Sequence, residues 1–135
     1  MKDASLGRGT DPRVGRSRGE PGDPMDMREA QRRVHEWISQ FEEGYWPPLS
    51  NLARLTEEVG ELARLMNHKF GHKPKKAGED EQDLALELAD ILFVLLVIAN
   101  EQGIDLDEAL ERTLEKYRMR DAERWTPKNR DRPGL

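Results

Sequence analysis

Four acidic residues occur as two pairs with the same spacing. Glu58 and Glu61 are three positions apart, and so are Glu87 and Asp90. Residues three apart lie on the same face of an α-helix, so two facing antiparallel helices would bring four carboxylates together. Like charges about 4 Å apart repel by about 4 kcal/mol even at an effective dielectric of about 20, so such a cluster raises its own pKa values unless a positive charge neutralises it. Carboxylate oxygens favour Mg²⁺ or Mn²⁺, and Mg²⁺ commonly bridges carboxylates to substrate phosphates.

Two other interpretations of these acids have to be weighed. A solvated helix surface explains Glu58 and Glu61 when they are considered alone. Glu87 and Asp90, however, lead into the most apolar segment of the chain, where unpaired carboxylates face a desolvation cost. A di-iron carboxylate site would need Glu-x-x-His on two helices, and neither pair has that form. The histidines lie elsewhere, at His35, His68 and His72. The oxygen-only set therefore favours phosphate chemistry.

The composition indicates a small, highly charged domain. The chain has 135 residues, 36% of them charged, and a formal net charge of −5. Residues 25–125 hold 14 basic and 22 acidic residues, a net charge of −8, which argues against general nucleic-acid binding. There is no cysteine, which excludes disulfides, thiolate zinc sites and cysteine nucleophiles. The length predicts one domain and excludes a large multidomain enzyme.

The ends of the chain are predicted to be tails. Residues 1–25 are rich in glycine and proline and poor in large aliphatics, which predicts a disordered N-terminal tail, and 127–135 predict a flexible C-terminal one. Met25 or Met27 is a candidate for the natural start. No secretory signal is visible, and the longest apolar run, Ile91 to Ala99, is far shorter than a membrane span. We therefore expect a cytoplasmic protein that binds neither membrane nor nucleic acid.

Four helices would position the acidic pairs, and the fold class is all-α. The predicted ranges are about 26–43, 50–69, 81–102 and 105–125, with no strand-like alternation of useful length. Asp26 with Glu29, and Asp105 with Glu108, have the form of capping boxes. An inner apolar stripe is predicted for the second helix at Leu52, Leu55, Val59, Leu62 and Met66, and for the fourth at Leu106, Ala109, Leu110, Leu114 and Tyr117.

The third predicted helix is apolar on all sides from Ile91, which predicts a buried central element. Three partners of this size do not easily cover it. We therefore expect a four-helix bundle that assembles as a homodimer or a dimer of dimers.

The acidic pattern with its flanks resembles the MazG-like nucleoside triphosphate pyrophosphohydrolases, in their short, single-domain bacterial branch. The pattern is Glu-Glu-x-x-Glu at 57–61 and Glu-x-x-Asp at 87–90, followed by Ile-Leu-Phe. The flanks are Phe-Glu-Glu-Gly-Tyr-Trp at 41–46, Asn-His-Lys-Phe-Gly at 67–71, Lys-Pro-Lys-Lys at 73–76, and Arg-Asp through Arg-Trp at 120–125. The resemblance covers about residues 27–127 and places a MazG-like domain at 26–126. It implies an all-α dimeric or tetrameric enzyme that cleaves a nucleoside triphosphate between its α- and β-phosphates.

By this resemblance Glu58, Glu61, Glu87 and Asp90 would be the Mg²⁺ ligands. Glu57 would orient or deprotonate the attacking water; its alternative is a solvent-facing residue paired with a neighbouring arginine. Lys116, Arg120 and Arg124 are candidates for contacting the phosphates, including those of a neighbouring subunit. Their alternative is to complement the helix dipole. Many relatives have Lys-Asn-x-x-Arg where this chain has Arg120-Asp121, so Asp121 argues against a direct phosphate role at its position.

The remaining candidates concern the nucleoside and a lid. Trp46 and His68 are candidates for stacking on the base, and Asn51 for contacting a sugar or base edge. Lys69 lies in a basic segment at 67–76 that would close over substrate or form a plain solvated loop. The expected function is Mg²⁺-dependent nucleotide pyrophosphohydrolysis in nucleotide-pool cleaning. The alternatives are a phosphoribosyl-ATP pyrophosphohydrolase and a non-enzymatic helical interaction protein.

Overall fold

The structure is a computed structural model that describes residues 22, 24–78 and 83–128. Its helices are α1 (Met27–Ser39), α2 (Pro48–Phe70), α3 (Leu84–Glu101) and α4 (Leu106–Asp121), and the described residues include no strand. The predicted all-α class is confirmed. Most of the two predicted tails, and the predicted start of the third helix at 81–82, lie outside the described residues.

Aspartates begin α1 and α4 as the sequence predicts. Asp26 accepts a hydrogen bond of 2.7 Å from the backbone N–H of Glu29. Asp105 accepts from the N–H groups of Asp107 at 3.0 Å and Glu108 at 3.2 Å. These bonds satisfy backbone donors that have no partner within the first turn. The predicted helix starts at both caps are therefore confirmed.

Other helix ends differ from the prediction, and α4 ends at Asp121 rather than at about 125. α1 ends at Ser39 rather than 43, because the chain then forms a turn that Gly44 closes with a φ of 59°. α2 begins at Pro48, two residues before the predicted start. A proline at the first helical position lacks only an N–H that has no helical partner there, and its fixed φ suits the helix.

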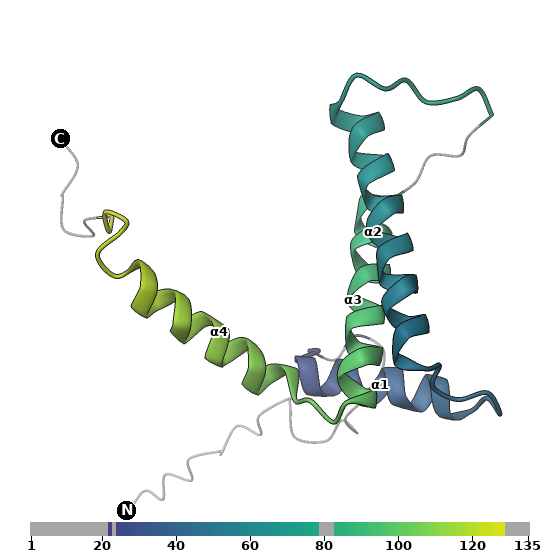
Figure 1. The fold of residues 1–135 in the computed structure, drawn as a ribbon, viewed down its shortest axis with the longest axis horizontal. Helices are drawn as coiled ribbons and strands as arrows, with labels where there is room; N and C mark the ends of the chain where they lie inside the picture. Colours follow the sequence, from purple (N-terminus) through teal and green to yellow (C-terminus); the bar gives the residue numbers. More distant parts are fainter. Residues whose placement is uncertain (1–21, 23, 79–82, 129–135) are drawn as a thin grey trace, which may run out of the picture.

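α2 and α3 form an antiparallel pair, and α1 crosses one end of it (Figure 1). Ala30 and Val34 of α1 pack with Leu96 and Val97 of α3 in the hydrophobic core. Four of the last eight residues of α3 are buried, which confirms part of the predicted central role of this segment.

Polar side chains fasten α1 to the end of α3. Gln31 donates from Nε2 to Oδ1 of Asn100 at 3.0 Å and to the carbonyl of Ile104 at 2.7 Å. Asn100 donates from Nδ2 to the carbonyl of Gln31 at 2.9 Å and to the hydroxyl of Tyr45 at 3.2 Å. These bonds fix the α3–α4 turn and the loop after α1 to one another.

α4 projects away from the α2–α3 pair, and only its beginning packs against α1 (Figure 1). Arg28 of α1 forms an ion pair with Asp105, with 2.7 Å between Nε and Oδ2. Leu110, Leu114 and Tyr117 of the predicted inner stripe are 42–50% exposed. One chain therefore does not close the four helices into a bundle.

The predicted inner stripe of α2 holds only in part for the single chain, where Leu55 and Leu62 are half-buried. Leu52, Val59 and Met66 are 53%, 48% and 42% exposed, whereas Asn51 and Leu65 are buried. The helix is apolar on two sides, and the side that faces α3 is the one that also carries Asn51.

Within the part of the chain that the structure describes, no helix has the length and hydropathy needed to cross a membrane.

Candidate functional site

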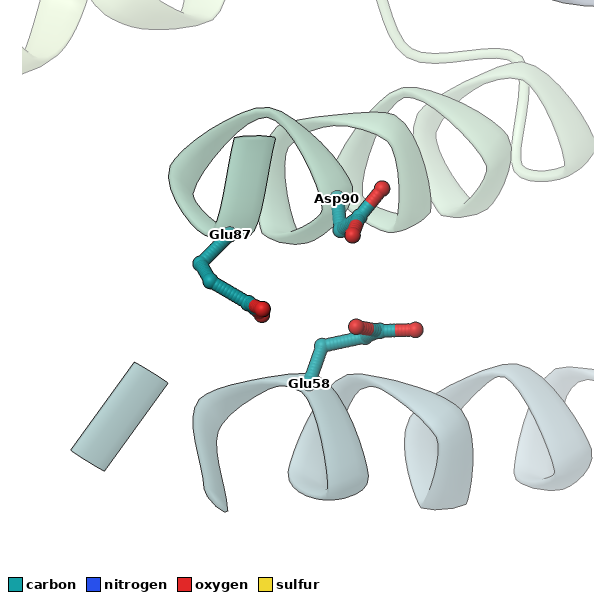
Figure 2. Close-up of side chains that lie close together, drawn as sticks. All are labelled: Glu58, Glu87 and Asp90. Carbon is teal, nitrogen blue, oxygen red and sulfur yellow. The ribbon is translucent and has the colours of Figure 1, made fainter. Parts of the chain in front are cut away.

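The antiparallel packing of α2 on α3 brings acids from the two helices together. Glu58 of α2 points toward Glu87 and Asp90 of α3 across the space between the helices (Figure 2). One carboxylate oxygen from each of the three lies within 4.8 Å of the others. Glu58 and Glu87 are half-buried and Asp90 is exposed, so a hydrated ion would have access from one side. We call these three residues the carboxylate cluster.

The carboxylate cluster is electrostatically strained. Partial burial, and then the negative charges of Asp90, Glu61 and Glu58, raise the pKa of Glu87 above its ordinary value. The Arg54 guanidinium brings a positive charge to the edge of the cluster, with 3.8 Å between its Nε and Oε1 of Glu58. A divalent cation bound by oxygen ligands would relieve this repulsion. The donor set therefore fits a hard metal ion.

Glu61 and Glu57 lie beside the carboxylate cluster without being part of it. Glu61 is exposed on α2, and it is not among the residues whose carboxylate oxygens lie within 4.8 Å of one another. Its negative charge nevertheless contributes to the raised pKa of Glu87. Glu57 is also exposed. Arg54 pairs with Glu58 rather than with Glu57. The structure thus brings together three of the four predicted metal ligands.

A pocket of about 370 Å³ opens along the same two helices. Its walls include Trp37 from α1, Tyr45 and Trp46 from the loop that follows, Asn51 and Arg54 from α2, and Phe93 from α3. Pockets of a few hundred Å³ with mostly apolar walls and a few polar groups are typical of small-ligand sites. Aromatic walls suit a nucleobase, which stacks on such rings for about 1–3 kcal/mol per base.

Trp46 and Asn51, two of the predicted nucleoside contacts, line this pocket. Trp46 is 51% exposed, so its ring is available to a ligand. Asn51 is only 2% exposed and donates from Nδ2 to the carbonyl of Trp46 and to Oε2 of Glu101, both at 3.1 Å. Asn51 thus also fixes the loop that carries Trp46.

His68 and Lys69 lie at the opposite end of α2 from this pocket. Seventeen residues separate Asn51 from His68, which is about 25 Å at the helical rise of 1.5 Å per residue. The Nδ1 atom of His68 is 3.2 Å from the carbonyl of Lys73 and so contacts the start of the loop that follows. A single chain does not place His68 and Trp46 on the same base.

The basic residues of α4 do not lie at the carboxylate cluster of their own chain. α4 projects away from the α2–α3 pair (Figure 1). The Lys116 amine lies 5.2 Å from the ring centre of Tyr117, Arg120 pairs with Asp121 at 2.9 Å, and Arg124 is 3.8 Å from the same aspartate. Asp121 is an ion-pair partner of both arginines, which agrees with the argument against its direct contact with phosphate.

Sequence reasoning missed the pocket and its arginine. Asn51, Arg54 and Glu58 follow one another at spacings of three and four, so they share one face of α2. Phe93 is three residues after Asp90 on α3. The acidic pairs already identify these faces of α2 and α3. Extending the same three- and four-residue spacing toward the loop at 41–46 would have identified Arg54 and Phe93.

Comparison with protein families gives one clear match. Residues 47–125 match the MazG nucleotide pyrophosphohydrolase domain. Two relatives are proteins of Bacillus subtilis described as uncharacterized. YpjD is 51% identical over 102 residues, which cover 76% of this chain and 92% of YpjD. YvdC is 24% identical over 102 residues, which cover 71% of this chain and 96% of YvdC.

Two crystal structures have a similar fold. The structure of YpjD from Bacillus subtilis superposes with a TM-score of 0.63 at 49% identity, covering 70% of this chain and 96% of YpjD. The structure of a Bacillus-conserved MazG protein, described as a nucleotide pyrophosphohydrolase, superposes with a TM-score of 0.61 at 36% identity. The match covers 82% of this chain and 99% of that protein.

Proposed function

Since this chain belongs to the family of MazG nucleotide pyrophosphohydrolase domains, we propose that it hydrolyses (deoxy)nucleoside triphosphates between the α- and β-phosphates. The products are the nucleoside monophosphate and pyrophosphate, and the role is removal of unwanted nucleotides from the pool. The observation that carries the proposal is the carboxylate cluster, with three acids within 4.8 Å, beside an aromatic pocket on the same pair of helices.

Glu58, Glu87 and Asp90 would hold Mg²⁺, with Glu61 as a further ligand from the same face of α2. Mn²⁺ is the expected substitute, because it also prefers oxygen ligands. When bound, the ion polarises phosphate oxygens and lowers the pKa of a water molecule. The raised pKa of Glu87 supports this assignment, because its partial burial and the neighbouring negative charges oppose its ionisation, and a bound cation would offset both.

Other residues of the chain activate the water and bind the nucleoside. Glu57, exposed one position before Glu58, orients or deprotonates the attacking water. Trp46 stacks on the base in the pocket, and Asn51 contacts the nucleoside while holding the Trp46 loop. The base and the reacting phosphate are then fixed at once, which reduces the entropic cost of reaching the reactive geometry.

Self-association is part of the proposal. Large apolar side chains are exposed on all four described helices, among them Leu88 of α3 at 51%, Val59 of α2 at 48% and Leu110 of α4 at 50%. A second copy packed on these faces would bury them. It would also let Lys116, Arg120 and Arg124 reach the phosphates at a neighbour's cluster, with His68 and Lys69 at the margin of that shared site. We therefore propose a homodimer or a dimer of dimers.

A product assay tests the activity. The full chain is incubated with common and altered nucleoside triphosphates and with phosphoribosyl-ATP, each with Mg²⁺ or with EDTA. We expect monophosphate and pyrophosphate in equal amounts with Mg²⁺ only. Turnover confined to phosphoribosyl-ATP would transfer the proposal to that substrate. No turnover, together with flat calorimetric titrations of Mg²⁺ and of a non-hydrolysable triphosphate, would favour a helical interaction protein.

A further inference from the structure

The side chain of Arg54 lies between the aromatic pocket and the carboxylate cluster. Arg54 lines the pocket, and its guanidinium carbon lies 5.7 Å from the ring centre of Trp46 and 5.4 Å from that of Phe93. Its Nε is 3.8 Å from Oε1 of Glu58, a member of the cluster. The same side chain therefore borders both parts of the site.

The order of residues along the helices gives Arg54 a defined place. Glu58 is four residues further along α2, which is about 6 Å at the rise of 1.5 Å per residue. On the antiparallel α3, Phe93 in the pocket is followed in the reverse direction by Asp90 in the cluster. Along the helix pair, the pocket therefore comes first, the Arg54 guanidinium second and the carboxylate cluster third. A nucleotide whose base fills the pocket and whose polyphosphate meets the cluster places its first phosphate between them.

The guanidinium is able to accept such a ligand. Its side chain is 37% exposed, and its nearest carboxylate oxygen, at 3.8 Å, is too far for a hydrogen bond. Among the described residues its contacts are with the Trp46 and Phe93 rings and with Glu58, which leaves its N–H donors for a phosphate. Arginine binds phosphate with paired, charge-assisted hydrogen bonds, which a lysine does not reproduce.

From this arrangement we propose that Arg54 is a substrate-binding residue that holds the α-phosphate, the one phosphate shared by the triphosphate substrate and the monophosphate product. The inference rests on the proposed function, because it takes a nucleotide as the ligand. It adds a residue from the chain's own α2 to the phosphate contacts. When the nucleotide binds, Arg54 exchanges its long contact with Glu58 for the phosphate and keeps its place against the two rings.

Binding measurements on Arg54→Met and Arg54→Lys test the proposal. Methionine preserves an unbranched side chain against the rings and removes the charge, while lysine keeps the charge and loses the paired donors. The control is Arg112→Met, which removes the same charge from the exposed face of α4. Thermal unfolding monitored by circular dichroism checks that each variant folds. Calorimetry with Mg²⁺ present measures the affinity for a nucleoside, its monophosphate and inorganic pyrophosphate.

We expect Arg54→Met to weaken monophosphate binding at least about tenfold, the effect of losing a charged hydrogen bond. Nucleoside and pyrophosphate affinities should change less than about twofold, and Arg112→Met should bind like the unmodified chain. The monophosphate affinity of Arg54→Lys should lie between those of Arg54→Met and the unmodified chain. Equal losses for nucleoside and monophosphate would overturn the inference, since Arg54 would then only shape the pocket, and so would unchanged monophosphate binding. If the unmodified chain binds no nucleotide, the proposed function itself fails.

Discussion

The side-chain amide of Asn51 on α2 donates a hydrogen bond of 3.1 Å to Oε2 of Glu101 on α3, fifty residues further along the chain. The same nitrogen donates to the carbonyl of Trp46 at 3.1 Å. A residue that the sequence suggested for ligand recognition thus ties the pocket loop to the helix pair. At 2% exposure, Asn51 is the one buried polar residue of the described core.

Replacing Asn51 should destabilise the protein even without ligand. Asn51→Ala removes both hydrogen bonds and leaves two partly buried acceptors without this donor, which should lower the free energy of unfolding by about 1–3 kcal/mol. Urea denaturation measures the change. Ser50→Ala, at the exposed neighbouring position, is the control. Equal stability of Asn51→Ala and the unmodified chain would show that these bonds contribute little.

Neutralising one acid of the proposed metal site should abolish activity while the fold survives. Glu61→Gln and Asp90→Asn each remove one negative charge from exposed positions, so neither creates a cavity. We expect Mg²⁺-dependent pyrophosphate release to fall by more than about a hundredfold, as for other losses of electrostatic stabilisation. Circular dichroism reports the fold, and Glu123→Gln beyond α4 is the control. Retained turnover in either variant would reject that residue as a ligand.

Mg²⁺ should raise the melting temperature of the unmodified chain. A ligand at a hundred times its dissociation constant stabilises the folded state by about 2.7 kcal/mol, which amounts to several degrees for a domain of this size. Glu87→Gln should lose most of this rise, because it removes one of the carboxylates proposed to hold the ion. Differential scanning fluorimetry with Mg²⁺ and, as the control for ionic strength, Na⁺ measures both. A rise that survives in Glu87→Gln would place the ion elsewhere.

Glu29 should stabilise the protein in a pH-dependent manner. Hydrogen bonds from Arg32 and then Arg33 lower the pKa of its carboxyl group from 4.5 to about 2. A carboxyl with a lowered folded pKa favours folding above its unfolded pKa and loses this effect as the pH falls. Glu29→Gln should therefore melt below the unmodified chain at pH 6, and the gap should narrow between pH 4.5 and about 2. Glu42→Gln is the control, and a gap independent of pH would contradict the assignment.

Self-association should depend on the apolar face of α4. Leu114 is 42% exposed on that face, so Leu114→Asp should shift the protein from dimers or tetramers toward monomers by placing a charge in the proposed interface. Arg112→Asp puts the same side chain on the other face of α4 and should leave assembly intact. Sedimentation velocity measures both. A monomeric unmodified chain would contradict the proposed assembly.

The sequence by itself determined the local structure and the chemistry of the acids. Asp26 and Asp105 identify helix starts because a cap acts on backbone groups within one turn. The three-residue spacings place Glu58 with Glu61 and Glu87 with Asp90 because helical periodicity is a property of the chain alone. The oxygen-only donor set likewise follows from residue types.

Only the tertiary structure decided which faces meet. α2 is apolar on two sides, and periodicity groups Leu52 with Val59 without saying whether that side meets α3 or remains exposed. The register of α2 against α3 then sets Arg54 between the pocket rings and Glu58, and selects Glu58 over Glu61 for the carboxylate cluster. Such contacts depend on the sum of many small packing energies between distant segments, which no local pattern encodes.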